Sequence, residues 1–215
     1  MLDQVLEHAA AIVAATELPV SADFESGYAE TPEGVAQNIQ RVAATGLAGC
    51  SIEDFTGDRK APIYELSEAV ERVAAAAEAA RGVAGGFVLT ARAENYLHGR
   101  RDLDDTLRRL QAFEAAGADV LYAPGLPDLE AVRTVCGAVS KPVNVIISEA
   151  LARHGVDELS AAGARRISFG SALARVAMGA ALRAAEETRK HGSFGWLVQV
   201  PAIGTLNRFM ASPGA

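Results

Sequence analysis

Three short segments of this sequence carry polar residues two positions apart at the end of a predicted strand. The pairs are Asp23 and Glu25, Ser51 and Glu53, and Arg92 and Glu94. Side chains at positions i and i+2 of a strand point to the same face. Because burying an unpaired polar group costs roughly 2–7 kcal/mol, three such pairs in succession indicate a site. Carboxylates beside a guanidinium predict a metal ion and an anionic substrate.

The composition limits the class of protein. Half of the 215 residues are hydrophobic and 22% are charged, which suits a chain with a sizeable core. The net charge of −7 argues against a nucleic-acid or anionic-membrane surface, so an anionic ligand needs a local arginine or metal ion. No apolar run reaches the roughly 18 residues of a membrane span. Residues 1–4 lack the basic start of a signal peptide, and Cys50 and Cys136 form no disulfide framework, so we expect a cytoplasmic protein.

Strands and helices alternate along the chain. Strands are predicted over residues 18–24, 49–54, 87–93, 119–123, 142–147 and 166–169. Helices are predicted over residues 2–16, 31–45, 65–81, 102–117, 128–138, 155–162 and 171–190. This alternation demands a parallel sheet with helical crossovers, and no linker divides residues 1–215, which we expect to form a single domain.

Polar residues gather where the predicted strands end and the helices begin, the face on which (β/α) barrels place their active sites. We count about six βα units, whereas a closed barrel of this kind has eight. The predicted fold is therefore an α/β protein of the (β/α)8 TIM-barrel type, incomplete, with C-terminal helices.

Four motifs follow one another in an order that resembles a known family. They are residues 19–28 (PVSADFESGY), 52–54 (IED), 90–94 (TARAE) and 166–173 (RISFGSAL). Together they resemble the isocitrate lyase/phosphoenolpyruvate mutase superfamily, in its short-chain branch, over essentially the whole chain. The resemblance implies a Mg²⁺-dependent barrel that makes or breaks a C–C or P–C bond next to a 2-oxo acid, through an enolate. It also implies a homotetramer whose neighbours exchange the last barrel helix.

The resemblance extends to individual residues. Asp23 resembles the carboxylate closest to the metal, with Glu25 in place of a frequent aspartate. Glu53 resembles the family's metal-site glutamate, which acts partly through water, and is also predicted to be catalytic. Arg92 resembles the arginine that grips the substrate oxyanion or carboxylate, and Ser21 is a further predicted substrate-binding residue. Mg²⁺ prefers oxygen ligands and keeps several waters, so few direct carboxylates are enough. Mg²⁺ and Arg92 together can stabilise the negative charge on an enolate oxygen more than they stabilise the neutral carbonyl of the ground state.

Each assignment has a structural alternative. The two carboxylates at positions 23 and 25 could be surface groups, and Glu53 could cap a helix. Arg92 could neutralise Glu53 or Glu94 in a buried network. Asp54 faces the opposite side of its strand, so we expect it to be structural, as a cap for nearby backbone. The segment Gly170–Ala172 is more often a tight turn than an anion site.

The loop over residues 55–63 departs from the family. It lacks the Lys-Cys-Gly-His segment of a true isocitrate lyase, which disfavours isocitrate and methylisocitrate cleavage. It also lacks the asparagine-bearing segment associated with phosphonopyruvate enzymes. A glycine hinge among charged residues still suits a mobile lid, in which Thr56, Asp58 and Arg59 are equal candidates for substrate contact.

The family's first two strands have no counterpart in this sequence. We expect either a start inside a longer gene product, which is the favoured interpretation, or another chain that covers the gap. The predicted strands near Val20 and Ile167 then have open hydrophobic edges, an aggregation hazard. We therefore expect an oligomer or an aggregate of residues 1–215 rather than a monomer.

The predicted function is a Mg²⁺-dependent lyase or hydrolase that cleaves a C–C bond of a small 2-oxo or 2-hydroxy dicarboxylate, oxaloacetate being an example. One alternative is a hydrolase or mutase that breaks the P–C bond of phosphonopyruvate. Another is a catalytically inactive barrel with a binding or oligomeric role. The lid does not decide between C–C and P–C chemistry.

Overall fold

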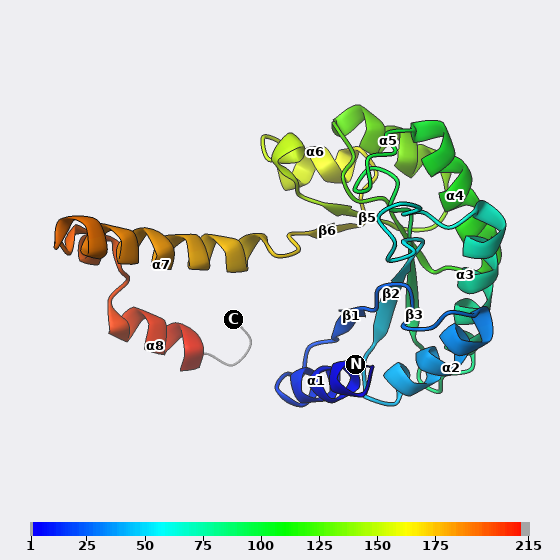
Figure 1. Ribbon diagram of the computed structural model, residues 1–215, viewed down its shortest axis with the longest axis horizontal. Coiled ribbons are helices and arrows are strands. Elements are labelled where there is room, and N and C mark those ends of the chain that lie inside the picture. Colours follow the sequence, from blue (N-terminus) through cyan, green and yellow to red (C-terminus); the bar gives the residue numbers. More distant parts are fainter. Residues whose placement is uncertain (1, 212–215) are drawn as a thin grey trace. The chain divides into compact units, whose positions relative to one another are not determined.

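The structure is a computed structural model that describes residues 2–211. The chain separates into two compact units, Met1–Ser168 and Phe169–Ala215. Within residues 2–211, the first unit contains all the strands and six of the α-helices, and the second contains only helices and turns (Figure 1). Each unit is described separately below, and the single domain expected over residues 1–215 stays a prediction.

The first unit is built on a six-stranded parallel sheet. Its strands are β1 (Ser21–Asp23), β2 (Gly49–Glu53), β3 (Val88–Arg92), β4 (Val120–Tyr122), β5 (Val143–Ile146) and β6 (Arg166–Ser168). Neighbours in the sequence are also neighbours in the sheet, so the strand order is β1 to β6 without a crossover. The sheet curls inside an arc of helices (Figure 1), which confirms the incomplete (β/α) barrel.

The helices lie close to their predicted positions. They are α1 (Leu2–Ala14), α2 (Pro32–Ala43), α3 (Leu66–Arg81), α4 (Leu103–Ala116), α5 (Leu129–Ala138) and α6 (Val156–Ala161). The Thr31 hydroxyl caps α2 by accepting the N–H of Gly34 at 3.2 Å, and Asp102 caps α4 in the same way. Gly117 ends α4 with a φ of 108°, which glycine adopts without strain. A short 3₁₀ helix over Glu149–Leu151 was not predicted.

The two faces of the strands differ in polarity. Cys50, Leu89, Ala91 and Leu121 are fully buried and belong to the core formed with the helices. The alternate residues of the same strands point to the opposite, concave side of the sheet. These alternate residues are largely polar, and they include Asp23, Glu53, Thr90, Arg92, Asn144 and Arg166. The strand period of two therefore separates the core from the polar side.

A buried ionic network lies behind the carboxyl ends of β2 and β3. Arg109 of α4 contacts Asp54 at 3.0 Å and Asp105 at 2.9 Å. It also donates to the carbonyl of Tyr64 at 2.9 Å. Asp54 in turn accepts the backbone N–H of Glu94 at 2.8 Å, so the acid has the structural role expected for it. Burial raises the pKa of Asp54 to about 6, although Arg109 opposes this shift.

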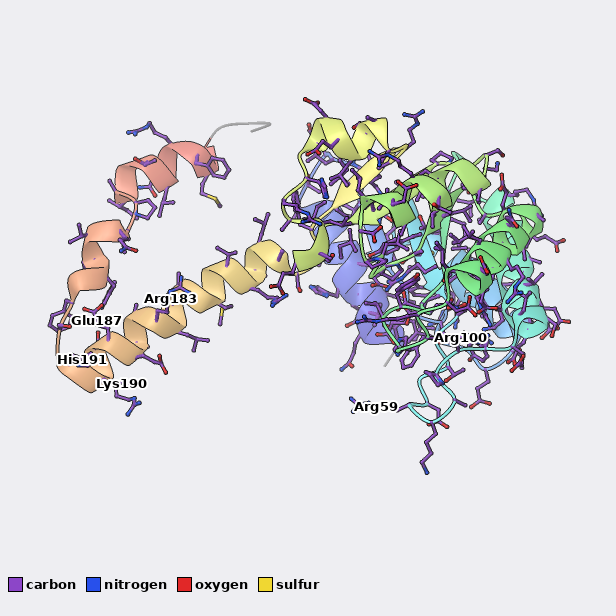
Figure 2. The ribbon with its side chains drawn as sticks, turned by 90° about the horizontal axis from the view of Figure 1, so that it is seen from above. Arg59, Arg100, Arg183, Glu187, Lys190 and His191 are labelled. Atoms are coloured by element: carbon purple, nitrogen blue, oxygen red, sulfur yellow. The ribbon has the colours of Figure 1, made fainter. Side chains whose placement is uncertain are left out.

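The second unit consists of α7 (Ala172–His191), a 3₁₀ helix (Gly195–Gln199) and α8 (Ile203–Ala211). The turn after α7 is tied to the helix because the Trp196 indole donates to the Thr188 hydroxyl at 3.1 Å and Ser193 donates to Glu187 at 2.8 Å. Figure 2 shows Glu187, Lys190 and His191 near the end of α7. No residue of these three helices is buried. Their exposed apolar side chains include Leu173, Val176, Leu182, Leu197 and Phe209.

None of the helices within residues 2–211 combines the length and the apolar character that a membrane crossing requires.

We predict that Arg109→Ala lowers the free energy of unfolding by about 3–5 kcal/mol, because it leaves the buried Asp54 carboxylate without its charged partner. The matched control is Arg108→Ala, whose side chain is 63% exposed, against 2% for Arg109. An exposed ion pair contributes about 1 kcal/mol or less. Urea denaturation of both variants measures the difference. An equal decrease in the free energy of unfolding of the two variants would show that the buried ionic network does not stabilise the first unit.

Candidate active site

The residues predicted to act together meet at the carboxyl ends of the first three strands. The register places Asp23 opposite Ser51, and Glu53 opposite Arg92. The Arg92 guanidinium contacts Asp23 at 2.5 Å and Glu53 at 3.2 Å. It also contacts Glu94 at 2.8 Å through Nη2 and at 2.9 Å through Nε. One arginine thus gathers three carboxylates from three adjacent segments.

The charges of this group do not balance. Arg92 carries one positive charge, whereas Asp23, Glu53 and Glu94 carry three negative charges when all are ionised. The side chains of Glu53 and Glu94 are 10% and 3% exposed, so water screens them poorly. Burial raises the pKa of Glu53 to about 7, Arg92 opposes the shift, and the neighbouring carboxylates add to it. The group therefore favours a bound cation or proton.

Glu25 reaches the same region by a different route from the one predicted. The strand β1 ends at Asp23, and Glu25 has a φ of 46°, so the alternation of a strand does not extend to it. The backbone N–H of Glu25 donates to Asp23 Oδ1 at 3.3 Å. Burial and a hydrogen bond with Glu25 raise the pKa of Tyr28 to about 12. A left-handed turn, rather than strand geometry, places Glu25 beside the site.

The fit of a metal ion depends on donor type and charge. Asp23, Glu25 and Glu53 offer the carboxylate oxygens that Mg²⁺ prefers, and the surplus of negative charge suits a divalent cation. Among residues 2–211, however, no three Asp, Glu, His or Cys side chains are grouped as metal ligands. Arg92 contacts the oxygens of Asp23 and Glu53 instead. The chemistry of the donors fits Mg²⁺, and the ligand assignment stays a prediction.

Ser21 lies at the start of β1, two residues before Asp23 and on the same face of the strand. It is exposed and opposite Gly49 in the neighbouring strand. Its assignment to substrate binding stays a prediction.

Three residues that the sequence pattern did not mark as site residues, Tyr122, Asn144 and Arg166, continue the site across the sheet. Tyr122 lies opposite Arg92, and the guanidinium carbon is 5.2 Å from the centre of its ring. Burial raises the pKa of Tyr122 to about 12, and the charge of Arg92 opposes the shift. Asn144 and Arg166 follow in the next two strands. Alternation within each strand could have placed them on this face, but only the register shows that they are neighbours.

The predicted lid is a hairpin attached firmly at its base. Phe55 and Ile63 form an isolated antiparallel bridge, and the Thr56 hydroxyl donates to the carbonyl of Ala61 at 2.7 Å. The ring of Phe55 stacks on His98 at 4.0 Å, and His98 lies 3.6 Å from Glu94. Figure 2 shows Arg59 on the loop that projects from the first unit. Its closure over a substrate stays a prediction.

Comparison with known proteins identifies the family. The sequence profile described as phosphoenolpyruvate phosphomutase matches residues 1–189, most of the chain. The chain belongs to this family. The resemblance inferred from the four sequence motifs is thereby confirmed.

Individual relatives show how far the similarity extends. A crystal structure of a lyase/mutase candidate from Burkholderia cenocepacia J2315 is 50% identical, with a TM-score of 0.93, over 99% of this chain and 77% of that one. The 2-methylisocitrate lyase of Escherichia coli K12 is 29% identical over 154 residues, 69% of this chain and 51% of that protein. An oxaloacetate decarboxylase of Bradyrhizobium diazoefficiens is 29% identical over 154 residues, 66% of this chain and 49% of that protein. The chain thus spans about half the length of these two curated relatives.

We predict that Glu53 titrates near pH 7 in the metal-free protein, well above its ordinary value of 4.5. Because the folded-state pKa is raised, protonated Glu53 stabilises the fold below about pH 4.5, and this contribution is lost as the pH rises through about 7. Glu53→Gln should remove that part of the pH dependence. The measurement is the free energy of unfolding at pH 5 and pH 8 with a chelator present. Glu71→Gln, at an exposed position of α3, is the control, and an unchanged pH dependence in Glu53→Gln would contradict the prediction.

Proposed function

We propose that this chain carries the active site of an enzyme that cleaves a C–C bond of a small 2-oxo or 2-hydroxy dicarboxylate, such as oxaloacetate, through an enolate. The observation that carries the proposal is the Arg92 guanidinium, held by three carboxylates at the carboxyl ends of parallel strands. Two relatives, a 2-methylisocitrate lyase and an oxaloacetate decarboxylase, cleave C–C bonds of small acids, which supports the same class of reaction here.

The chain's own residues supply charge stabilisation and a proton. The planar guanidinium of Arg92 donates hydrogen bonds in a fixed direction, so it can stabilise the enolate oxygen more than the neutral carbonyl. Its contacts with Asp23, Glu53 and Glu94 fix its plane, and the Tyr122 ring lies beneath it. Without a bound cation the pKa of Glu53 is about 7, so its carboxyl can hold a proton near neutral pH, whereas a cation beside it would favour the ionised carboxylate, which can accept a proton.

Asp23, Glu25 and Glu53 would hold Mg²⁺, which would stabilise negative charge on the enolate oxygen when bound. The support for this assignment is the excess of carboxylate over guanidinium charge. A cation there would also reduce the repulsion that an anionic substrate meets.

Cleavage of a P–C bond is the second candidate function. The family profile is that of a phosphoenolpyruvate phosphomutase, and a phosphonate presents an anionic group to the same arginine. Assays with oxaloacetate and with phosphonopyruvate distinguish the two candidates. Turnover of neither substrate would favour a barrel without catalytic activity.

We also propose that the chain assembles into a homo-oligomer through its second unit. The helices α7 and α8 bury none of their own residues and expose apolar side chains such as Leu182 and Phe209. Exchange of α7 between subunits would cover such a surface. Light scattering of the purified chain measures its mass and tests the assembly.

We predict that Arg92→Lys lowers kcat/KM at least tenfold on whichever of the two substrates is turned over. Lysine keeps the charge but cannot contact three carboxylates with a planar fork. Arg101→Lys, at an exposed position after β3, is the control and should retain activity. Wild-type kinetics in Arg92→Lys would restrict Arg92 to a structural counter-ion.

We predict that Asp23→Asn weakens Mg²⁺ binding roughly tenfold or more, because it removes a charged oxygen ligand. Isothermal titration calorimetry with MgCl₂ measures the affinity. Asp3→Asn is the control, since the Asp3 side chain is 81% exposed and pairs with Arg41 of α2. An unchanged affinity in Asp23→Asn would remove Asp23 from the metal site.

A further inference from the structure

A second arginine lies on the concave side of the sheet, and the proposed reaction does not use it. The register places Arg92, Tyr122, Asn144 and Arg166 directly opposite one another in four consecutive strands. All four therefore share the polar face. Arg166 is exposed at the start of β6.

The two arginines differ in the charge of the groups that surround them. Arg92 contacts three carboxylates, whereas the contacts of Arg166 are with neutral groups. Its Nε donates to the amide oxygen of Asn144 at 3.0 Å, and its Nη2 lies 3.4 Å from the Thr90 hydroxyl. Within residues 2–211, no carboxylate forms an ion pair with Arg166. A guanidinium has five N–H donors, so several remain for a ligand.

Asn144 organises the groups beside Arg166. Its side chain is buried, with 3% of the residue exposed. The amide oxygen orients the guanidinium, and the amide nitrogen donates to the Ser168 hydroxyl at 3.2 Å. Among residues 2–211, the Ser168 hydroxyl accepts this hydrogen bond and donates none, so its proton is available to a ligand. A planar cation and a hydroxyl donor are thus held side by side by one buried amide.

The position of the Arg166 side chain brings it close to the candidate active site. Its guanidinium reaches Thr90, which lies on the same strand and the same face as Arg92. Two residues of a strand span roughly 6.6 Å, so a small molecule held near Arg92 can extend to Arg166. The carboxylates around Arg92 repel a second acidic group, and Arg166 offers the opposite potential.

We propose that Arg166 and Ser168, oriented by Asn144, form an anion subsite for the acidic group of the substrate that is remote from the reacting carbon. The subsite selects dicarboxylates, or carboxylates that also carry a phosphonate, over monocarboxylates. The substrate class rests on the proposed function, but binding at the subsite requires no turnover. A guanidinium and a neighbouring hydroxyl can both donate hydrogen bonds to the oxygens of a planar carboxylate.

The test compares the affinities of malonate and acetate, neither of which is the proposed substrate, by isothermal titration calorimetry with Mg²⁺ present throughout. We expect the wild-type chain to prefer malonate. Arg166→Gln should weaken malonate binding at least tenfold and leave acetate binding unchanged. Arg166→Lys should be intermediate, since it keeps the charge and loses the fork. Because neither probe has to react, failure of the C–C cleavage assay leaves this result intact.

The matched control is Arg165→Gln, which removes the same charge one residue away. Burial raises the pKa of Cys136 and the charge of the nearby Arg165 opposes this shift, so Arg165 lies on the helix side of the sheet rather than the concave side. The proposal is overturned if the wild-type chain shows no preference for malonate or if Arg166→Gln binds malonate with wild-type affinity. It is also overturned if Arg165→Gln loses as much malonate affinity as Arg166→Gln does. Circular dichroism measures whether each variant is folded. If Arg166→Gln is not folded, the malonate affinity of Arg166→Lys decides the question.

Discussion

The buried ion pair between Arg109 and Asp54 supports the backbone on which the candidate active site is built. Asp54 directly follows Glu53, and it accepts the N–H of Glu94. The site residues at the ends of β2 and β3 are therefore attached to α4 through one guanidinium. A buried charge without its partner is costly, so this arrangement has few alternatives in the folded chain. Arg92 connects the same strands from the opposite side of the sheet, so their ends are held from both sides.

Much of the fold follows from local patterns in the sequence. The helix caps at Thr31, Asp102 and Gly117 follow from their residue types, because a cap depends on a few adjacent residues. The grouping of Glu53 and Arg92 also follows from the sequence, because the alternation within a strand and the parallel order of the strands can both be predicted from it. The metal and substrate roles assigned to these residues stay predictions.

The remaining features depend on contacts that no local pattern contains. The positive φ of Glu25 arises where β1 ends, two residues earlier than the polar pattern suggested. The contact of Arg109 with Asp54 joins residues 55 positions apart. The alignment of Asn144 with Arg166 requires the strand register, which depends on the packing of the whole sheet. The division at Ser168 likewise appears only in the folded chain.

The stacking of Phe55 on His98 makes the hairpin and the ionic group thermodynamically linked. His98 contacts Glu94, which in turn pairs with Arg92, so a displacement of the hairpin changes the surroundings of a buried carboxylate. Burial lowers the pKa of His98, so the ring in the stack is predominantly neutral near pH 7. By reciprocity, any ligand that alters the charge around Glu94 also alters the free energy of moving the hairpin. We therefore expect the occupancy of the site and the position of the hairpin to be coupled through His98.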